Sequence, residues 1–242
     1  MSQTSNPAHT PTILIVGASR GLGHAIAAEI LQKGWNVMGT VRAGSGRTLL
    51  HELADAHPGR VEIETLDITR PDEIQSLRGR LSGRTFDILF VNAGTTNPDP
   101  TQTIGEVSTE DFVNLMIANA LSPMRVVERL SDLVPPTGLI GVMSSGQGSV
   151  ADNESGQREV YRGSKAALNQ FMRSFAARQG QIDDRPRAML LMAPGWVRTE
   201  LGGAEGRLSI EESVPGVVNV LLDKLGRPGL EYLDYRGRTV RW

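Results

Sequence analysis

Short apolar runs alternate along the chain with longer stretches in which apolar residues recur at helical spacing. We predict buried strands near residues 12–16, 35–40, 61–65, 86–91, 138–143 and 187–192. In the first intervening stretch, Leu22, Ile26 and Ile30 recur at i, i+4 and i+8, which is typical of a helix face packed on a sheet. Repeated strand and helix units predict an α/β fold, with a doubly wound parallel sheet covered by helices on both faces.

A glycine-rich turn follows the first predicted strand. Residues 12–23 read T-I-L-I-V-G-A-S-R-G-L-G, with glycines at positions 17, 21 and 23 before an apolar helical stretch. Glycines allow the backbone to turn tightly and to approach a pyrophosphate, while the amides of the new helix face the phosphates. The G-x-x-x-G-x-G spacing differs from the commoner G-x-G-x-x-G pattern, and a purely structural turn is the alternative interpretation.

The run V-Y-R-G-S-K-A-A-L places Tyr161 and Lys165 four residues apart. In a helix over residues 160–178 they share one face, about 6 Å apart along the axis. An ammonium about 4 Å from the phenol contributes roughly 4 kcal/mol at an effective dielectric of about 20, enough to lower its pKa by about 3 from about 10. We therefore expect Lys165 to make Tyr161 a usable acid. A pair that only covers the helix surface is the alternative.

Taken together, the glycine turn and the Y-x-x-x-K run resemble those of the classical short-chain dehydrogenase/reductase family, and the likeness extends from about residue 12 to the end of the chain. The segments Y-R-G-S-K-A-A-L-N, P-G-W-V-R-T and D-Y-R-G-R-T-V-R-W look most like the branch of sniffer-type and C-factor-type carbonyl reductases. The resemblance implies a single-domain Rossmann fold over residues 11–242. It also implies hydride transfer between a nicotinamide cofactor and an aldehyde, ketone or alcohol of small to medium size.

The resemblance implies a catalytic set of Asn119, Ser145, Tyr161 and Lys165. Tyr161 would donate a proton to the carbonyl oxygen, and Ser145 would hydrogen-bond that oxygen as charge develops. Lys165 would also bind the ribose of the nicotinamide. Asn119 would hold a water that joins the lysine to a proton relay.

Two serines precede the tyrosine, at positions 144 and 145. In the family the catalytic serine is followed by x-x-G, and Gly148 then selects Ser145 over Ser144. Sixteen residues separate Ser145 from Tyr161, which is more than is usual in the family. We expect the extra length to form a longer loop over the substrate side.

The resemblance further implies a cofactor site built mainly from loops that follow predicted strands. Asp67 would bind the adenine, Val197 would present its backbone to the nicotinamide carboxamide, and Thr199 would contact the same group. The expected cofactor-binding residues are Gly17, Ser19, Arg20, Gly21, Leu22, Gly23, Arg42, Asp67, Ile68, Asn92, Ala93, Gly94, Tyr161, Lys165, Pro194, Gly195, Val197 and Thr199.

The choice of nicotinamide cofactor can be argued from charge, because NADP carries a 2'-phosphate where NAD carries a hydroxyl. Val41 stands where an NAD enzyme of the family usually has an aspartate, which would repel the phosphate. Arg42 and Arg20 can converge on that phosphate, at about 1.5 to 3 kcal/mol per charge-assisted hydrogen bond. We therefore expect NADPH/NADP to be preferred over NAD. Two ordinary surface arginines are the alternative.

The composition limits the other classes of function. The chain has 242 residues, 39% of them hydrophobic, and its net charge of −2 leaves no broad basic footprint for nucleic acid. No run approaches about 20 apolar residues, so we expect no membrane interaction. Cysteine is absent and the four histidines lack metal-ligand spacing, so we expect no metal site. Residues 1–10 lack the apolar core of a signal peptide, which predicts a flexible tail and a cytoplasmic protein.

Three alternatives stay open. The chain could be an NADP(H)-binding sensor or signalling protein without relevant turnover, instead of an enzyme. Residues 201–206, L-G-G-A-E-G, could form a lid over the substrate or a plain connector. The resemblance implies a homodimer or homotetramer, and an apolar stripe on the Tyr161 helix could belong to the core or to a subunit interface. The stripe consists of Leu168, Phe171, Met172 and Phe175.

Overall fold

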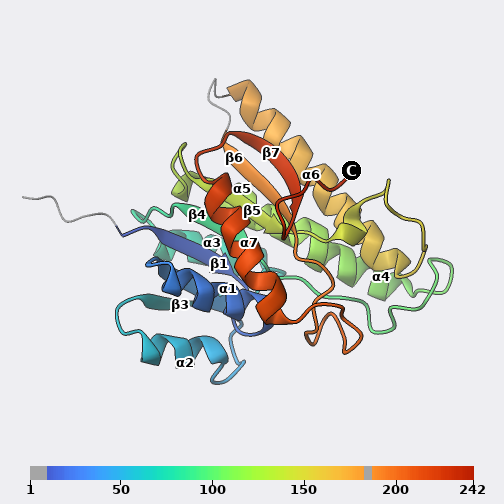
Figure 1. The fold of residues 1–242 in the computed structure, drawn as a ribbon, viewed down its shortest axis with the longest axis horizontal. Helices are drawn as coiled ribbons and strands as arrows, with labels where there is room; N and C mark the ends of the chain where they lie inside the picture. Colours follow the sequence, from blue (N-terminus) through green and yellow to red (C-terminus); the bar gives the residue numbers. More distant parts are fainter. Residues whose placement is uncertain (1–9, 183–186) are drawn as a thin grey trace, which may run out of the picture.

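The computed structural model describes residues 10–182 and 187–242, so the tail expected over residues 1–10 lies almost wholly outside the described residues. Within the described part of the chain, seven parallel strands form one sheet in the order β3-β2-β1-β4-β5-β6-β7 (Figure 1). The strands are β1 (Thr12–Val16), β2 (Asn36–Val41), β3 (Val61–Thr65), β4 (Ile88–Val91), β5 (Leu139–Met143), β6 (Ala188–Ala193) and β7 (Gly229–Asp234). The six predicted strands are confirmed, each within two residues of its predicted bounds.

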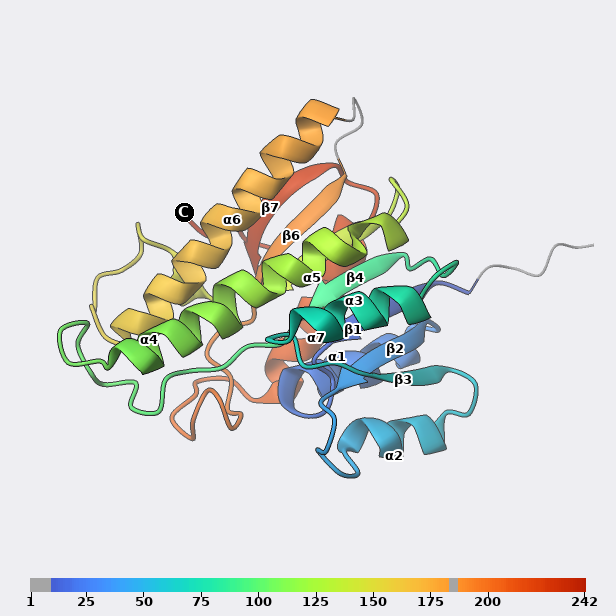
Figure 2. The same ribbon diagram turned by 180° about the vertical axis from the view of Figure 1, so that it is seen from behind.

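Helices cover both faces of this sheet, as the alternating pattern predicts. One face carries α1 (Gly21–Gln32), α2 (Leu49–Ala56) and α7 (Ile210–Lys224) (Figure 1). The other carries α3 (Pro71–Arg80), α5 (Ser122–Leu130) and α6 (Glu159–Ile182) (Figure 2). A further helix, α4 (Thr109–Met116), leads into α5 through a π-helical turn, Ile117–Leu121. The molecule is thus the expected single-domain, doubly wound α/β fold.

An apolar core fills the space on each side of the sheet. On the first face, Ile26 and Ile30 of α1 pack in one cluster with Val217 and Leu221 of α7. Leu22, the first member of the predicted helix face, is partly buried against the same cluster. Burying each of these side chains stabilises the fold by roughly 1.5 to 3 kcal/mol.

The apolar stripe on α6 belongs mainly to the second core. Leu168, Met172 and Phe175 are buried in the core that α6 forms with α5 and the sheet. Phe171 differs, since 45% of its surface is exposed. The core interpretation is therefore confirmed for three of the four residues, and Phe171 faces outward.

The seventh strand, β7, was not predicted. It lies at the edge of the sheet and pairs with β6 alone. Its sequence, G-L-E-Y-L-D, mixes the buried Tyr232 and Leu233 with Glu231 and Asp234. An edge strand needs no continuous apolar run, so the periodicity that marks the other strands is missing here.

The strand order fixes where a ligand can bind. From β1 the chain proceeds outward to β3, and from β4 it proceeds in the opposite direction to β7. The direction changes between β1 and β4, and open α/β sheets bind ligands beyond the carboxyl ends of the strands at such a point. The glycine turn, Asn92, the serine pair and Pro194 directly follow β1, β4, β5 and β6, respectively. Among the residues described here, no helix combines the length and apolar character of a membrane span.

Candidate active site

The turn between β1 and α1 has no room for side chains at two of its glycines. The carbonyl oxygen of Gly17 accepts a hydrogen bond of 2.7 Å from Nδ2 of Asn92. A Cβ on Gly23 would lie 2.0 Å from that oxygen, and a Cβ on Gly17 would lie 2.9 Å from Ala93. The first turn of α1, G-L-G-H, carries no carboxylate. The amides that open a helix have no partner within it, and they therefore suit the phosphates of a dinucleotide. Half-buried residues complete the turn: Ser19, Gly21 and Leu22.

The residues expected around the adenine follow β2 and β3. Ile68 is buried, whereas Arg42 is exposed. Burial alone would raise the pKa of Asp67, but hydrogen bonds from Thr69 and the charges of Arg42 and Arg70 lower it overall. Arg42 is therefore close enough to Asp67 for their charges to interact. These two expected residues follow the neighbouring strands β2 and β3.

Arg20 makes a different contact. Its Nη1 lies 3.0 Å from Oε2 of Glu200, in the segment after β6, and the two side chains are 62% and 72% exposed. The ion pair joins the glycine turn to the segment in which Thr199 is expected to meet the nicotinamide. A pair this exposed contributes at most about 1 kcal/mol, so a phosphate group can compete with Glu200 for Arg20.

Asn119 lies in the π-helical turn between α4 and α5, an irregularity that is frequent at functional sites. It is fully buried. Its Oδ1 accepts from the amide of Thr95 at 2.8 Å, and its Nδ2 donates to the carbonyl of Thr95 at 2.8 Å and to Oγ of Ser164 at 3.0 Å. A Cβ on Gly94 would lie 3.2 Å from Oδ1 of Asn119 and 3.4 Å from Nζ of Lys165. Gly94 therefore keeps a narrow space open between the amide and the ammonium.

Tyr161 and Lys165 lie one turn apart on α6, and both are buried, with 7% and 3% of their surfaces exposed. Nζ of Lys165 lies 5.9 Å from the centre of the Tyr161 ring and donates to the carbonyl of Met143 at 3.0 Å. The helix over residues 160–178 and the shared face are confirmed. A pair that merely covers the surface is excluded by this burial.

The pKa values of the pair differ from the sequence argument. Burial raises the pKa of Tyr161, and a hydrogen bond with Ser145 and the charge of Arg158 oppose that rise without reversing it. Burial lowers the pKa of Lys165 to about 8. The expectation that Lys165 brings the Tyr161 pKa down to neutrality is therefore wrong for this structure. The reason is that removing the phenol from water disfavours its charged form more than the available charges favour it.

The structure separates the two serines by their partners. Ser144 is buried, and its Oγ donates to Oδ1 of Asn169 at 2.6 Å. Ser145 caps the short 3₁₀ turn Gly146–Gly148, where its Oγ accepts from the amide of Gln147 at 3.1 Å, and it opposes the rise of the Tyr161 pKa. The two serines therefore have different roles in the fold: Ser144 bonds Asn169, and Ser145 caps the turn and lies near the phenol.

Hydrogen bonds and a β-bridge hold the segment after β6 against neighbouring elements. The carbonyl of Pro194 accepts from Oγ of Ser213 on α7 at 2.7 Å, and Gly195 has a φ of 85°. Val197 is buried and pairs with Leu208 in an isolated bridge. These contacts hold the expected nicotinamide segment at the carboxyl end of β6.

The candidate lid, residues 201–206, folds back on that segment. Oγ1 of Thr199 accepts from the amide of Gly202 at 3.0 Å, and the indole of Trp196 donates to the carbonyl of Gly202 at 2.7 Å. Nη1 of Arg198 donates to the carbonyl of Gly206 at 2.9 Å. The loop is therefore held by hydrogen bonds at both ends, and Thr199 has a partner within it.

Two residues at the site were missed by the sequence reasoning. Asn169 bonds Ser144, and the hydroxyl of Tyr232 donates to the carbonyl of Ser145. A signal for Asn169 was present, since it is a polar residue one helical turn beyond Lys165 on a face that is otherwise apolar. Tyr232 had no such signal because its strand was not predicted.

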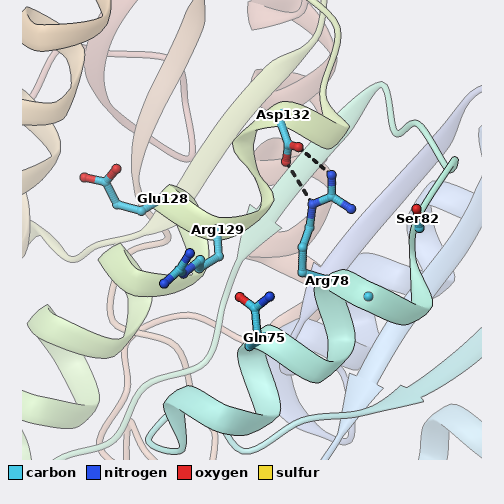
Figure 3. A pocket seen from close by; sticks show the side chains of 7 residues that line it. Gln75, Arg78, Ser82, Glu128, Arg129 and Asp132 are labelled. Carbon is cyan, nitrogen blue, oxygen red and sulfur yellow. Dashed lines mark hydrogen bonds and ion pairs between the residues drawn. The ribbon is translucent and has the colours of Figure 1, made fainter.

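A separate hollow of about 520 Å³ lies between α3 and α5 (Figure 3). An ion pair between Arg78 and Asp132 joins its two walls. The hollow shares no residue with the motifs, and its lining is charged and polar. It is lined by Gln75, Arg78, Gly79, Ser82, Glu128, Arg129 and Asp132.

Comparison with known proteins agrees with this geometry. The profile of the short chain dehydrogenase family matches residues 11–207. A short-chain dehydrogenase/reductase of Burkholderia multivorans with bound NADP is 77% identical, covers 97% of this chain and 100% of its own, and superposes with a TM-score of 0.94. A carbonyl reductase of Pseudomonas aeruginosa PAO1 in complex with NADP is 35% identical, with coverage of 97% and 100% and a TM-score of 0.86. The C-signal protein of Myxococcus xanthus is 32% identical over 160 residues, 64% of this chain and 92% of that protein. The chain therefore belongs to the short-chain dehydrogenase/reductase family of oxidoreductases, in the branch of the sniffer-type and C-factor-type carbonyl reductases.

Proposed function

We propose that this protein is an NADPH-dependent carbonyl reductase, which reduces an aldehyde or ketone to an alcohol or catalyses the reverse oxidation. The observation that carries the proposal is the buried cluster at the carboxyl end of the sheet. There Tyr161 lies one helical turn from Lys165, and Ser145 is close enough to the phenol to oppose the rise of its pKa. A phenol, a hydroxyl and an ammonium placed together can protonate and stabilise an oxygen that gains negative charge.

The residues present fit a dinucleotide cofactor. The turn after β1 has a backbone that would collide with a Cβ at Gly17 or Gly23, and it leads into the amides of α1. Gly94 leaves its space open beside Asn119 and Lys165. When bound, NADPH supplies the hydride. In this proposal the glycine turn holds the diphosphate and the remaining residues of the expected cofactor site hold the two nucleosides.

Tyr161 is the proton donor. Its raised pKa keeps the phenol protonated at neutral pH, which is the form that a general acid needs. Lys165, with a pKa of about 8, is roughly nine-tenths protonated at pH 7 and stabilises the phenolate that forms when the proton leaves. Ser145 hydrogen-bonds the substrate oxygen. Asn119, across the gap kept by Gly94, positions the water through which the proton is replaced.

The preference for NADPH rests on the adenosine side. Val41 supplies no carboxylate at the end of β2, and Arg42, exposed next to it, interacts with Asp67. In this proposal Arg42 is the principal partner of the 2'-phosphate. Arg20 joins it when the phosphate displaces Glu200 from the exposed ion pair.

The proposed assembly is a homodimer or homotetramer built on the helices that carry the catalytic residues. In the described part of these helices and of the adjoining α4, five large apolar side chains are exposed: Phe112, Val113, Leu121, Phe171 and Ile182. A second copy of the chain is the simplest partner that would remove such side chains from water.

The alternative is an NADP(H)-binding sensor without relevant turnover, which the similarity to the C-signal protein keeps open. Titration of the purified protein with NADPH and with NADH, followed by NADPH oxidation against a panel of aldehydes and ketones, tests both functions. The proposal predicts tighter binding of NADPH and turnover of at least one carbonyl. Tight binding without turnover would favour the sensor. Binding of neither nucleotide would contradict both.

A further inference from the structure

Tyr232 is a fully buried tyrosine whose hydroxyl reaches the loop that carries Ser145. It lies in β7, with 1% of its surface exposed, and its hydroxyl donates to the carbonyl oxygen of Ser145. The same oxygen accepts from the amide of Gly148 at 2.9 Å. Two donors therefore hold the backbone carbonyl of Ser145.

A buried hydrogen-bond network surrounds this contact. Oγ of Ser144 donates to Oδ1 of Asn169, and Nδ2 of Asn169 donates to the carbonyl of Gly148 at 3.2 Å. A Cβ on Gly148 would lie 2.8 Å from that Nδ2. Burial raises the pKa of Tyr232 to about 12, although hydrogen bonds with Asn169 and Ser144 oppose the rise. The phenol thus stays a hydrogen-bond donor throughout the neutral range.

Residues 239–242 fold over Tyr232 from outside. The ring of Trp242 meets the Tyr232 ring edge to face, with the ring centres 5.6 Å apart, and the guanidinium of Arg173 stands 4.6 Å from the Trp242 ring centre. The carbonyl of Trp242 accepts from the amide of Ala151 at 3.0 Å, and Arg241 forms an ion pair with Asp152. Both views of the ribbon place this end of the chain beside α6 and β7 (Figure 1, Figure 2).

These contacts tie three parts of the molecule together next to the candidate site. A hollow of about 440 Å³ is lined by Gly146 of the serine loop (residues 144–152), by Ala193 at the end of β6, by Gly195 just after it, and by Val240. The segment that holds Tyr232 therefore borders the same space as the serine loop and the expected nicotinamide segment. Its contacts reach the serine loop at residues 145, 151 and 152.

We propose that Tyr232, held in place by Trp242, is a positioning residue that fixes the backbone of Ser145 for catalysis. This inference rests on the proposed function, because it assigns a role relative to the reaction of Ser145 and Tyr161. Removal of the Tyr232 hydroxyl leaves the Ser145 carbonyl with one donor and frees the 3₁₀ turn to shift. A displacement of about 1 Å in a reacting group lowers a rate by as much as about a hundredfold.

The test combines hydrogen exchange with steady-state kinetics on the full chain. Tyr232→Phe keeps the ring and removes only the hydroxyl. Trp242→Ala removes the outer contact at an exposed residue, Trp242→Phe restores an aromatic ring there, and Arg236→Ala changes an exposed side chain of the same segment whose partner is Tyr235. The exchange of amides 146–152 is measured without ligand. NADPH oxidation is measured with 9,10-phenanthrenequinone as the probe.

We expect Tyr232→Phe and Trp242→Ala to speed exchange at amides 146–152 and to lower kcat by about ten- to a hundredfold. The Kd for NADPH should stay within about twofold, because the cofactor contacts are untouched. The basic limb of the pH profile should move upward in both variants, because the hydrogen bond from Ser145 that holds the Tyr161 pKa down is weakened. Trp242→Phe should recover most of the loss, and Arg236→Ala should change none of these quantities.

Unchanged exchange and unchanged kcat in Tyr232→Phe and Trp242→Ala would overturn the inference. A loss of kcat that comes with an equal loss of NADPH binding would also overturn it, since that result describes general damage to the fold. If Tyr232→Phe fails to fold, the hydrogen exchange and kcat of Trp242→Ala alone decide whether the inference holds. A wild-type protein that does not oxidise NADPH with the probe would contradict the proposed function instead, and the exchange data would still decide whether Tyr232 holds the serine loop.

Discussion

The ammonium of Lys165 lies 5.9 Å from the ring centre of Tyr161, one helical turn away, and donates to the carbonyl of Met143. The two buried groups have pKa values that shift in opposite directions and move apart: that of Lys165 falls to about 8 while that of Tyr161 rises. Both changes favour the uncharged forms, as burial requires. The pair therefore holds a protonated phenol beside an ammonium that is easily neutralised.

The lowered pKa of Lys165 makes the stability of the protein depend on pH. The unfolded chain has the ordinary lysine pKa near 10.5, so between pH 8 and 10.5 it binds more protons than the folded protein, and stability rises with pH there. Lys165→Met removes this effect. From pH 7 to pH 10 we expect the wild type to gain roughly 2 to 3 kcal/mol of unfolding free energy relative to the variant. Urea denaturation at several pH values measures the gap, and parallel curves would contradict the assigned pKa.

The crowding around Gly23 means that the glycine turn accepts no side chain at this position. A Cβ there would lie 2.0 Å from the Gly17 carbonyl, whereas a Cβ on Gly21 would meet no atom of the described chain within 4 Å, although its φ of 56° is strained for alanine. We expect Gly23→Ala to abolish NADPH binding and to lower stability by about 2 kcal/mol or more. Gly21→Ala should lower stability by about 1 kcal/mol. Calorimetric titration and thermal melts compare the two, and equal losses would show that crowding is not the cause.

Glu200 competes with the cofactor phosphate for Arg20. Glu200→Gln removes the competing charge, and since the ion pair is exposed we expect NADPH to bind only about two- to fivefold more tightly. NADH, which lacks the phosphate, should gain less. Glu205→Gln neutralises another exposed carboxylate in the same loop and serves as the control. If both variants improve NADPH binding equally, the effect comes from net charge and not from release of Arg20.

Arg42 carries most of the proposed discrimination between cofactors. Arg42→Ala should weaken NADPH binding by about ten- to a hundredfold, the equivalent of one or two charge-assisted hydrogen bonds, and should leave NADH nearly unchanged. Fluorescence titration with both nucleotides gives the ratio. The same weakening for NADH would place Arg42 at a part of the cofactor that the two nucleotides share.

The sequence was sufficient to predict those elements that have a strong local signal. Six strands and the helix of Tyr161 follow from apolar runs and helical spacing. The burial of Tyr161 and Lys165 could not be predicted, because it depends on which elements pack over α6, and the direction of the Tyr161 pKa was wrong for that reason. The link from Tyr232 to Ser145 spans 87 residues and joins an edge strand without periodicity to a loop.

The contact between Arg20 and Glu200 shows a different limit of sequence reasoning. Arg20 lies in the glycine turn and Glu200 follows the expected nicotinamide segment, but nothing in either local sequence indicates that these two loops meet. For a charged side chain in a surface loop, pairing with one exposed partner or another gives nearly the same free energy. Such pairings follow from the folded positions of the strands and not from the residues themselves.

NADPH oxidation by Tyr161→Phe tests the central claim most directly. The substitution keeps the ring in its buried position and removes only the proton donor. With a carbonyl that the wild type reduces, we expect kcat to fall by at least about a hundredfold while the Kd for NADPH stays within about twofold. A variant that retains wild-type turnover would contradict the assignment of Tyr161 as the acid, and with it the mechanism proposed for this protein.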